Sequence, residues 1–253
     1  MYTVRSYGMT DIGRRRQQNE DAFLRNDDIR LFVVADGMGG HAAGEVASAE
    51  AVDTIYGMVK RGLPNLGAEG DPLTDETISS ARRLIESAIQ AATYMVYAIS
   101  EVDANKSGMG TTISAAFIFK HVMVTGQVGD SRIYRCRDGE VLQLTEDHTL
   151  VGWQMKQGLI TEDEAKVSPH RNVITRSVGG RDYVEVDTGV IEIQPGDKFL
   201  FCSDGLHGYL QEAEIPDIMA LGGDNAAAGF IKLANERGGS DNITVVLVEV
   251  DDG

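Results

Sequence analysis

The chain has 253 residues, of which 42% are apolar and 25% are charged, as in ordinary globular proteins. Its formal net charge of −16 argues against nucleic acid and anionic membranes as partners, because their phosphates would be repelled by so acidic a surface. No apolar run is long enough to cross a membrane, and residues 1–5 lack an apolar signal core. We therefore expect a cytoplasmic protein without membrane insertion.

The first half of the chain predicts strands followed by helices. Residues 1–35 have the pattern of β structure, interrupted by a polar segment at 11–21. A glycine-rich segment at 37–44 leads into a helix that ends near Arg61, and a loop at 62–73 precedes a long amphipathic helix at 75–102. The apolar residues that recur at helical spacing in this long helix are expected in the core: Ile78, Ala81, Ile85, Ala88, Ala92, Met95 and Ile99.

The second half contains further strands around a polar excursion. Residues 110–145 predict two or three strands with a turn at Asp138-Gly139. The segment at 145–183 is polar and contains a short helix opened by a capping box from Thr161 to Glu164, which is typical of an excursion from the sheet that serves as a lid or a substrate surface. Strands at 186–193 and 197–202, helices near 211–221 and 223–237, and a strand at 243–250 follow. This segregation of helices and strands indicates an α+β fold.

Four apolar, strand-like runs begin or end at an aspartate: Asp36, Asp130, Asp204 and Asp241. If these strands share a sheet edge, the carboxylates meet there, and such crowding is costly unless a cation holds them. Oxygen ligands suit a hard divalent ion such as Mg2+ or Mn2+. Each Asp-Gly pair taken alone is more typical of a hairpin turn. The four positions together, with the acidic pair Glu20-Asp21, favour a metal site.

Six short motifs occur in an order and spacing that resemble a known family. They lie at residues 16–21 (Arg-Gln-Gln-Asn-Glu-Asp), 34–41 (Val-Ala-Asp-Gly-Met-Gly-Gly-His), 108–112 (Gly-Met-Gly-Thr-Thr), 128–132 (Val-Gly-Asp-Ser-Arg), 203–206 (Ser-Asp-Gly-Leu) and 240–242 (Ser-Asp-Asn). Together they resemble the metal-dependent protein phosphatases of type 2C, the PPM family, in its bacterial serine/threonine branch. The resemblance extends from Arg5 to Val248. It implies one catalytic domain over residues 1–253, built from two packed antiparallel β-sheets flanked by helices on both outer faces.

The resemblance also implies a cofactor of two core Mn2+ or Mg2+ ions, with a third, looser ion in many members. The implied metal ligands are Glu20, Asp21, Asp36, Gly37, Asp130, Asp204 and Asp241. In this family pattern Asp36 bridges the two core metals, and the Gly37 carbonyl ligates one of them.

The remaining ligands divide between the other ions. By resemblance, Asp204 and Asp241 hold the second core metal, and Asp21 lies there partly through water, with Glu20 beside it. Asp130 resembles the ligand of the third ion.

Arg16 matches the arginine that grips the substrate phosphate, where a guanidinium gives a bidentate clamp that lysine cannot copy. The implied nucleophile is a hydroxide that bridges the two metals, because metals lower the pKa of bound water. In animal members a histidine two residues after the bridging aspartate is the proposed general acid. Here that position is Met38, and the nearest histidine, His41, is the candidate proton donor, with helix-start packing as the alternative role.

Three further residues are candidates for a place near the site. The segment at about 147–180 resembles the variable flap of the family, which would influence the choice of substrate, and His170 or Arg171 within it is a candidate contact for a phosphopeptide. His207 follows the 203–206 motif and is expected as a solvated histidine, with a role beside the metal ligands as the alternative.

The function implied by the resemblance is a metal-dependent hydrolase of phosphoserine and phosphothreonine that opposes a serine/threonine kinase in signalling. Expected partners are phosphorylated proteins, including a cognate kinase and its substrates, and the expected state is a monomer. A non-catalytic relative would have lost Asp36, Asp204 or Asp241, and all three are present. The other alternative is a metal-dependent nuclease or nucleotide hydrolase, and the acidic charge and the lack of a basic stripe argue against a polymeric nucleic acid as its substrate.

Overall fold

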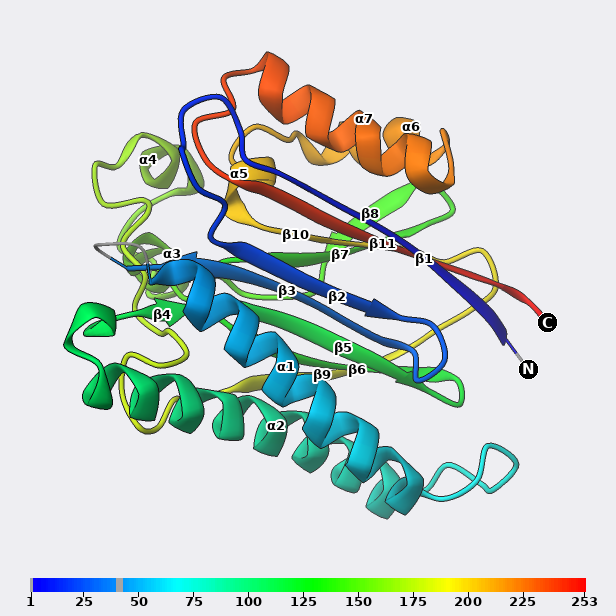
Figure 1. The fold of residues 1–253 in the computed structure, drawn as a ribbon. Coiled ribbons are helices and arrows are strands. Elements are labelled where there is room, and N and C mark those ends of the chain that lie inside the picture. Colours follow the sequence, from blue (N-terminus) through cyan, green and yellow to red (C-terminus); the bar gives the residue numbers. More distant parts are fainter. Residues whose placement is uncertain (1, 40–42) are drawn as a thin grey trace.

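The computed structural model describes residues 2–39 and 43–253, and its strands form two antiparallel sheets (Figure 1). The strands of the first sheet, in spatial order, are β1 (Tyr2–Asp11), β11 (Ile243–Asp252), β10 (Lys198–Cys202), β7 (Arg132–Arg137) and β8 (Glu140–Gln143). Those of the second are β2 (Asp21–Asn26), β3 (Leu31–Met38), β5 (Ile113–Phe119), β6 (Val122–Val128) and β9 (Asp187–Glu192), with β4 (Gly110–Thr111) paired to β3.

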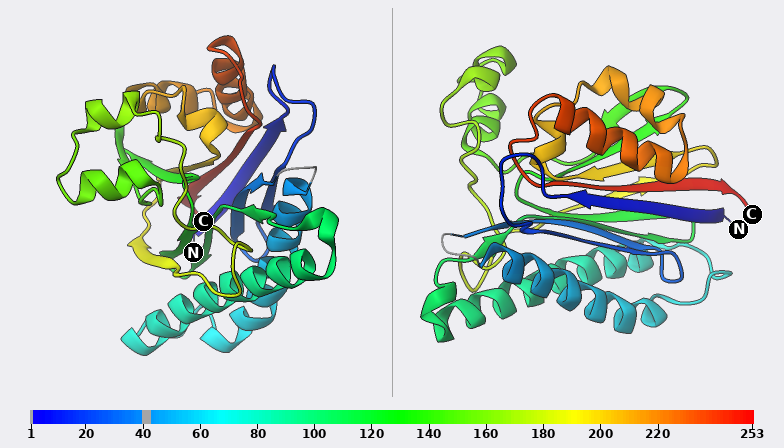
Figure 2. Two further views of the ribbon diagram at one scale, coloured as in Figure 1. Left: turned by 90° about the vertical axis from the view of Figure 1, so that its left-hand side faces the viewer. Right: turned by 45° about the horizontal axis from the view of Figure 1, so that its top comes forward.

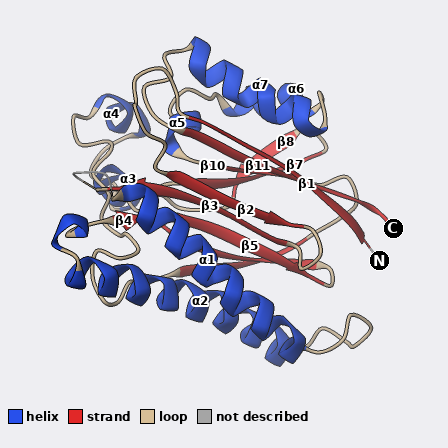
Figure 3. Ribbon diagram, in the orientation of Figure 1, coloured by secondary structure: helices blue, strands red, loops and turns tan. Residues whose placement is uncertain are grey.

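Helices cover both outer faces of this pair of sheets (Figure 3). The second sheet is covered by α1 (Gly44–Gly62) and α2 (Asp75–Val102), and the first by α5 (Asp204–His207), α6 (Ile215–Met219) and α7 (Gly223–Glu236). Short 3-10 helices lie at Leu63–Leu66, Ala104–Lys106 and Glu212–Glu214. The expected sandwich with helices on both sides is therefore the observed architecture.

Alternation along each central strand explains the layers. In β3, Phe32 and Val34 point between the sheets, whereas Leu31, Val33 and Ala35 point towards α1 and α2, and all of them are buried. The same alternation places Phe199 and Phe201 of β10 between the sheets. The rings of Phe32 and Phe201 meet across this layer with their centroids 6.2 Å apart. Strands buried on both faces read as continuous apolar runs, as these do.

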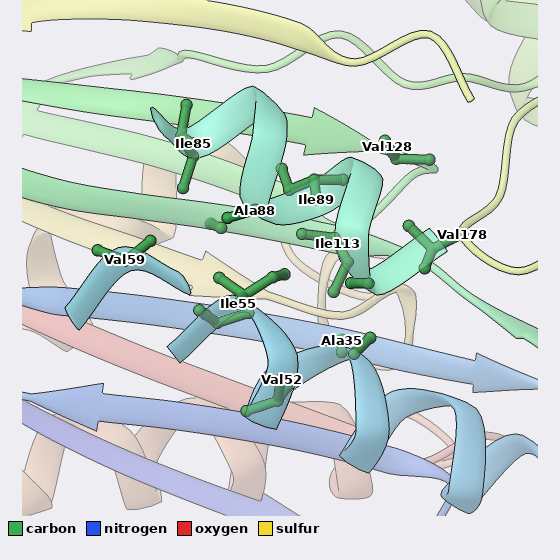
Figure 4. Close-up of a cluster of buried hydrophobic side chains, with 14 of the residues drawn as sticks. Ala35, Val52, Ile55, Val59, Ile85, Ala88, Ile89, Ile113, Val128 and Val178 are labelled. Carbon is green, nitrogen blue, oxygen red and sulfur yellow. The ribbon is translucent and has the colours of Figure 1, made fainter. Parts of the chain in front are cut away.

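The long helix α2 occupies the predicted range and packs one face on the second sheet. Ile85, Ala88 and Ile89 contribute to the cluster that this face forms with α1 and β5 (Figure 4). The prediction for Met95 is wrong, because its side chain is 41% exposed. Val96 is buried instead, since one residue corresponds to about 100° of rotation and Met95 lies at the margin of the apolar stripe.

The region 110–145 holds five strands where two or three were predicted, because β4 and β8 are too short for a clear pattern. The predicted helix near 211–221 is a 3-10 turn followed by the separate helix α6. The flap contains α3 (Leu150–Lys156) and α4 (Glu162–Val167), and the capping box at Thr161 and Glu164 is present. The flap projects from one end of the sandwich, whereas both chain ends lie at the opposite end (Figures 1 and 2).

Within the described residues, no helix combines the length and apolarity needed to cross a membrane.

Candidate active site

Strand pairing gathers the predicted aspartates at the end of the sandwich that carries the flap. Asp21 and Asp36 are direct partners in the antiparallel β2–β3 ladder, so their side chains share a face. Asp204 follows β10 and Asp241 precedes β11, and these two strands are also antiparallel neighbours. Asp130 lies in the turn from β6 to β7, where the chain crosses from one sheet to the other. The left view of Figure 2 looks onto this end.

The aspartates raise one another's pKa. Burial is the main cause for Asp36, whose pKa is raised well above its usual range, and the charges of Asp21, Asp204, Asp130 and Asp241 add to it. Burial also raises the pKa of Asp21 to about 7, against hydrogen bonds from Thr244 and Ser203.

Asp130 and Asp204 show the same effect. Burial, with the charges of Asp204 and Asp147, raises the pKa of Asp130 to about 7. The pKa of Asp204 is raised by burial and by Asp241, while a hydrogen bond with Asp36 opposes the rise. A group of carboxylates this enclosed is unfavourable in its ionised form without a positive partner.

Two carboxylate oxygens in this group point to such a partner. Asp21 Oδ1 and Asp204 Oδ1 are buried and receive no hydrogen bond from the residues that the structure describes. Within residues 2–39 and 43–253, no three acidic, histidine or cysteine side chains already stand in a coordination geometry. Enclosed oxygens without donors fit a hard divalent ion.

The backbone at Gly37 lies unusually close to the backbones of Glu20 and Gly44. Gly37 donates its N–H to the carbonyl of Glu20 at 3.1 Å. A Cβ at this position would lie 2.2 Å from the Gly44 carbonyl oxygen and 2.4 Å from that of Glu20, so only glycine fits. Burial raises the pKa of the neighbouring Glu20 side chain, and the Gly44 N–H opposes the rise as a hydrogen-bond donor.

Arg16 lies at the rim of the group and pairs with one of its members. Its Nη2 is 2.7 Å from Asp241 Oδ2, and its side chain is 47% exposed. This hydrogen bond is the main cause of the raised pKa of Arg16, with added attraction from Asp241, Glu20 and Asp36. The guanidinium is therefore next to the carboxylates and accessible to an incoming anion.

Polar residues beside the aspartates hold the loops of the site, and sequence reasoning assigned them no role. Asn242 is buried, accepts from the Glu20 N–H at 2.8 Å, and donates to the carbonyls of Ile12 at 3.0 Å and Gln18 at 2.9 Å. It thereby fastens the loop that carries Arg16. Ser203 donates to Asp21 Oδ2 at 2.9 Å and accepts from the Thr244 N–H at 3.0 Å. Both lie next to aspartates within the motifs, which was the available signal.

A buried polar network joins Asp36 to the Asp130 turn. Thr112 accepts from the Asp36 N–H at 3.0 Å, and its hydroxyl is 2.7 Å from that of Ser131. Gln127 donates to the Ser131 carbonyl at 2.7 Å. These three polar residues are almost fully buried. Their hydroxyl and amide groups fix the two aspartate backbones relative to each other.

The structure bears differently on the predictions for the histidines and for the flap residues. The prediction of a solvated His207 is wrong: the residue is half-buried, and its Nε2 lies 2.9 Å from the backbone oxygen of Asp130, beside the carboxylates as the alternative role required. Burial and the charge of Arg132 lower its pKa to about 3. His41 lies outside the described residues. His170 and Arg171 are exposed on the flap.

Comparisons with solved structures agree with this architecture. The serine/threonine phosphatase PstP/Ppp of Mycobacterium tuberculosis superposes with a TM-score of 0.87 at 32% identity, covering 98% of this chain and 99% of its own. The catalytic domain of PstP, solved in complex with two manganese ions, gives a TM-score of 0.85 at 32% identity, with complete coverage of both chains. The fold is thus that of the metal-dependent serine/threonine phosphatases.

The sequence comparisons identify the protein family. Residues 12–228 match the family model described as protein phosphatase 2C. The serine/threonine phosphatase stp of Listeria welshimeri is 41% identical over 245 residues, or 95% of this chain and 93% of that protein. The chain belongs to the protein phosphatase 2C family, as a serine/threonine protein phosphatase of the bacterial type. The expected family, fold and enzyme class are confirmed, and the expected manganese agrees with the metal in the PstP structure.

Proposed function

We propose that this chain removes phosphate from phosphoserine and phosphothreonine side chains of proteins, with Mn2+ or Mg2+ held by the carboxylates at the flap end of the sandwich. The observation that carries the proposal is the pair of enclosed oxygens, Asp21 Oδ1 and Asp204 Oδ1, which lack a donor among the described residues. Asp241, in the same group of carboxylates, pairs with the accessible Arg16. Such a site attracts a divalent cation and, beside it, a phosphate.

The ligand assignment follows the order of the motifs. Asp36 would serve both core ions, with the Gly37 carbonyl on one, and with Asp204, Asp241 and the pair Glu20-Asp21 towards the other. When bound, the ions would activate water and neutralise phosphate charge.

Asp130 would hold a third ion. Its turn lies between the two sheets and is joined to the backbone of Asp36 through Thr112 and Ser131. This connection supports a role for Asp130 in the same site.

Arg16 would bind and orient the substrate phosphate. It now donates to Asp241, and a phosphate with greater negative charge would compete for the same guanidinium. As an ion ligand, Asp241 would hold Arg16 less strongly, which would leave the guanidinium free to bind the phosphate. His41 is the proposed proton donor for the leaving hydroxyl.

The two cysteines do not supply a nucleophile. Burial raises the pKa of Cys202 to about 12, and it raises that of Cys136 as well, so both remain protonated thiols at neutral pH. This supports attack by water.

The proposal extends to the biological setting. Residues 1–253 would act as one monomeric catalytic domain in cytoplasmic signalling, opposing a serine/threonine kinase and acting on phosphorylated proteins. The flap at about 147–180 would select among substrates, with His170 and Arg171 in contact with the phosphopeptide. Their exposure on the flap, which lies at the same end as the carboxylates, supports this assignment.

Metal removal and restoration test the proposed chemistry. The protein is stripped with EDTA and assayed on a phosphothreonine peptide with Mn2+, Mg2+ or Ca2+ added back, beside double-stranded DNA as an alternative substrate. Turnover of the peptide that returns with Mn2+ or Mg2+ is expected. A folded protein that is inactive with every ion, or one that cleaves DNA instead, would contradict the proposal.

A further inference from the structure

The root of the flap is bonded directly to the turn that carries Asp130. His148 donates its backbone N–H to the Gly129 carbonyl at 2.9 Å, and the Gly129 N–H donates to His148 Nδ1 at 3.1 Å. Both backbone groups of Gly129 are therefore engaged by one residue. Gly129 has φ of +99°, and a Cβ there would lie 2.6 Å from Thr112, so no other residue fits this turn.

The other side of the His148 ring faces a pair of charges. Nε2 lies 3.2 Å from Asp187 Oδ2 and 3.2 Å from Arg176 Nη1, and that arginine nitrogen is 2.7 Å from Asp187 Oδ1. Because Nδ1 accepts from Gly129, it carries no proton, and Nε2 donates to Asp187. Burial foremost, with the charge of Arg176, lowers the pKa of His148. The ring is thus a neutral bridge with a fixed donor and a fixed acceptor.

His148 also joins the two ends of the flap. Its carbonyl accepts from the Thr175 N–H at 2.8 Å. The next residue, Thr149, forms a bridge with Ile174, and Leu150 donates to the Val173 carbonyl at 2.8 Å. The outgoing and returning segments of the flap are therefore hydrogen-bonded to each other at His148, the residue that also binds Gly129.

We propose that His148 is a positioning residue that couples the closed root of the flap to the turn bearing Asp130. Gly129 and Asp130 are adjacent, so a shift of the Gly129 peptide moves the Asp130 backbone. While the flap root is closed, the His148 ring holds that peptide and presents Asp130 to the site. This inference rests on the proposed function of Asp130 as an ion ligand. The simpler alternative is a buried histidine whose hydrogen bonds stabilise the fold without affecting the site.

Two conservative variants separate the ring's two contacts. In His148→Asn the amide oxygen takes the place of Nδ1 and can accept from Gly129, whereas in His148→Gln a polar atom takes the place of Nε2 and the Gly129 contact is lost. His121→Gln, in the exposed turn between β5 and β6, is the matched control.

The measurements are amide hydrogen exchange at Gly129 and Thr175 by NMR, and Mn2+ binding by calorimetry. We expect His148→Gln to speed exchange at Gly129 by about tenfold and to weaken the most weakly bound Mn2+ by about tenfold, while the tighter ions are unaffected. His148→Asn should restore most of both properties. Equal behaviour of the two variants, or unchanged Gly129 exchange in His148→Gln, would overturn the proposal.

Asp187→Ala is the second variant, because the Asp187 side chain is 43% exposed and its loss is tolerable for folding. It leaves Nδ1 in place but removes the acceptor that fixes the Nε2 proton, so a smaller acceleration at Gly129 is expected. Wild-type exchange in this variant would count against the bridge. Faster Gly129 exchange with all ions bound normally would also overturn the coupling, without bearing on turnover of the phosphopeptide by the wild-type protein.

Discussion

Asp36 directly faces Asp21 across a strand ladder, and like charges opposite each other in a sheet are destabilising. Asparagine keeps the volume of Asp36 and removes its charge. We expect Asp36→Asn to lower Mn2+-dependent turnover of a phosphothreonine peptide by at least about a hundredfold. The same variant should raise the melting temperature of the EDTA-treated protein, because it relieves repulsion. Full turnover, or a lower melting temperature without metal, would contradict the assigned role.

Arg16 is the accessible cation of the site, and its prediction concerns substrate binding. Arg16→Ala removes the guanidinium that would clamp the phosphate, so KM for the phosphopeptide should rise by about tenfold, with a smaller change in kcat. Arg16→Lys, the matched variant, keeps the charge without the planar fork and should give an intermediate KM. Steady-state kinetics at saturating Mn2+ measure both, and an unchanged KM in Arg16→Ala would refute the clamp.

At the scale of elements, the position of the site depends on links between strands. Thr112, immediately before β5, connects the Asp36 backbone at the end of β3 to Ser131 at the start of β7. Thr112→Val keeps the shape but leaves buried polar groups without a partner, which costs about 1–3 kcal/mol. We expect urea unfolding to show that loss, together with weaker Mn2+ binding. Thr112→Ser keeps the hydroxyl and should remain close to wild type; a larger loss in Thr112→Ser than in Thr112→Val would instead assign the effect to the methyl group.

The elements differ in how well the sequence predicts them. The helix at 75–102 was predicted with its observed limits, because its apolar period is long. The structure adds a cap at Thr74, whose side chain accepts a hydrogen bond from the Thr77 N–H. The two-residue strand β4 and the four-residue strand β8 were not predicted, because so few residues cannot show the alternation of apolar and polar residues that marks a strand. The pairing of Asp21 with Asp36 was also beyond the sequence pattern. It depends on the register between β2 and β3, which packing on both faces decides.

For the molecule as a whole, the buried carboxylates make stability depend on pH. The pKa values of Asp21 and Asp130 are raised from 3.8 to about 7 in the fold. The folded protein therefore binds more protons than the unfolded chain between these values, and the metal-free protein should lose stability as pH rises from 4 to 7. One unit of pKa difference corresponds to about 1.4 kcal/mol, so the loss is on the order of 4 kcal/mol for each of the two groups.

Urea unfolding of the EDTA-treated protein across this range measures the effect. Asp130→Asn should flatten the dependence, because the amide does not titrate. Saturating Mn2+ should reverse it, since bound cations favour the ionised carboxylates. A metal-free protein that is more stable at neutral than at acidic pH would contradict the raised pKa values.

The sequence revealed the charged members of the site and missed the residues that hold them. Four aspartates follow or precede apolar runs, and this pattern is visible in the linear sequence: Asp36, Asp130, Asp204 and Asp241. The role of the buried Gln127, a polar residue inside strand β6, has no such signature. Asn242 lies within a motif, but its bond to the Gln18 carbonyl could not be predicted, because the two residues are 224 positions apart along the chain. His207 was misjudged for the same reason: its partner, the Asp130 carbonyl, is 77 residues away along the chain.

Both chain ends lie at the end of the sandwich opposite the carboxylates and the flap, and Tyr2 is paired with Asp252 there (Figure 1). Coupling the protein to a sensor surface through either end would therefore leave the reaction face turned towards the flowing solution. A phosphorylated protein as large as the enzyme itself could then approach without meeting the support. Attachment through a residue of the flap would hinder that approach, so the two immobilised forms offer a direct comparison of how substrates of different size gain access.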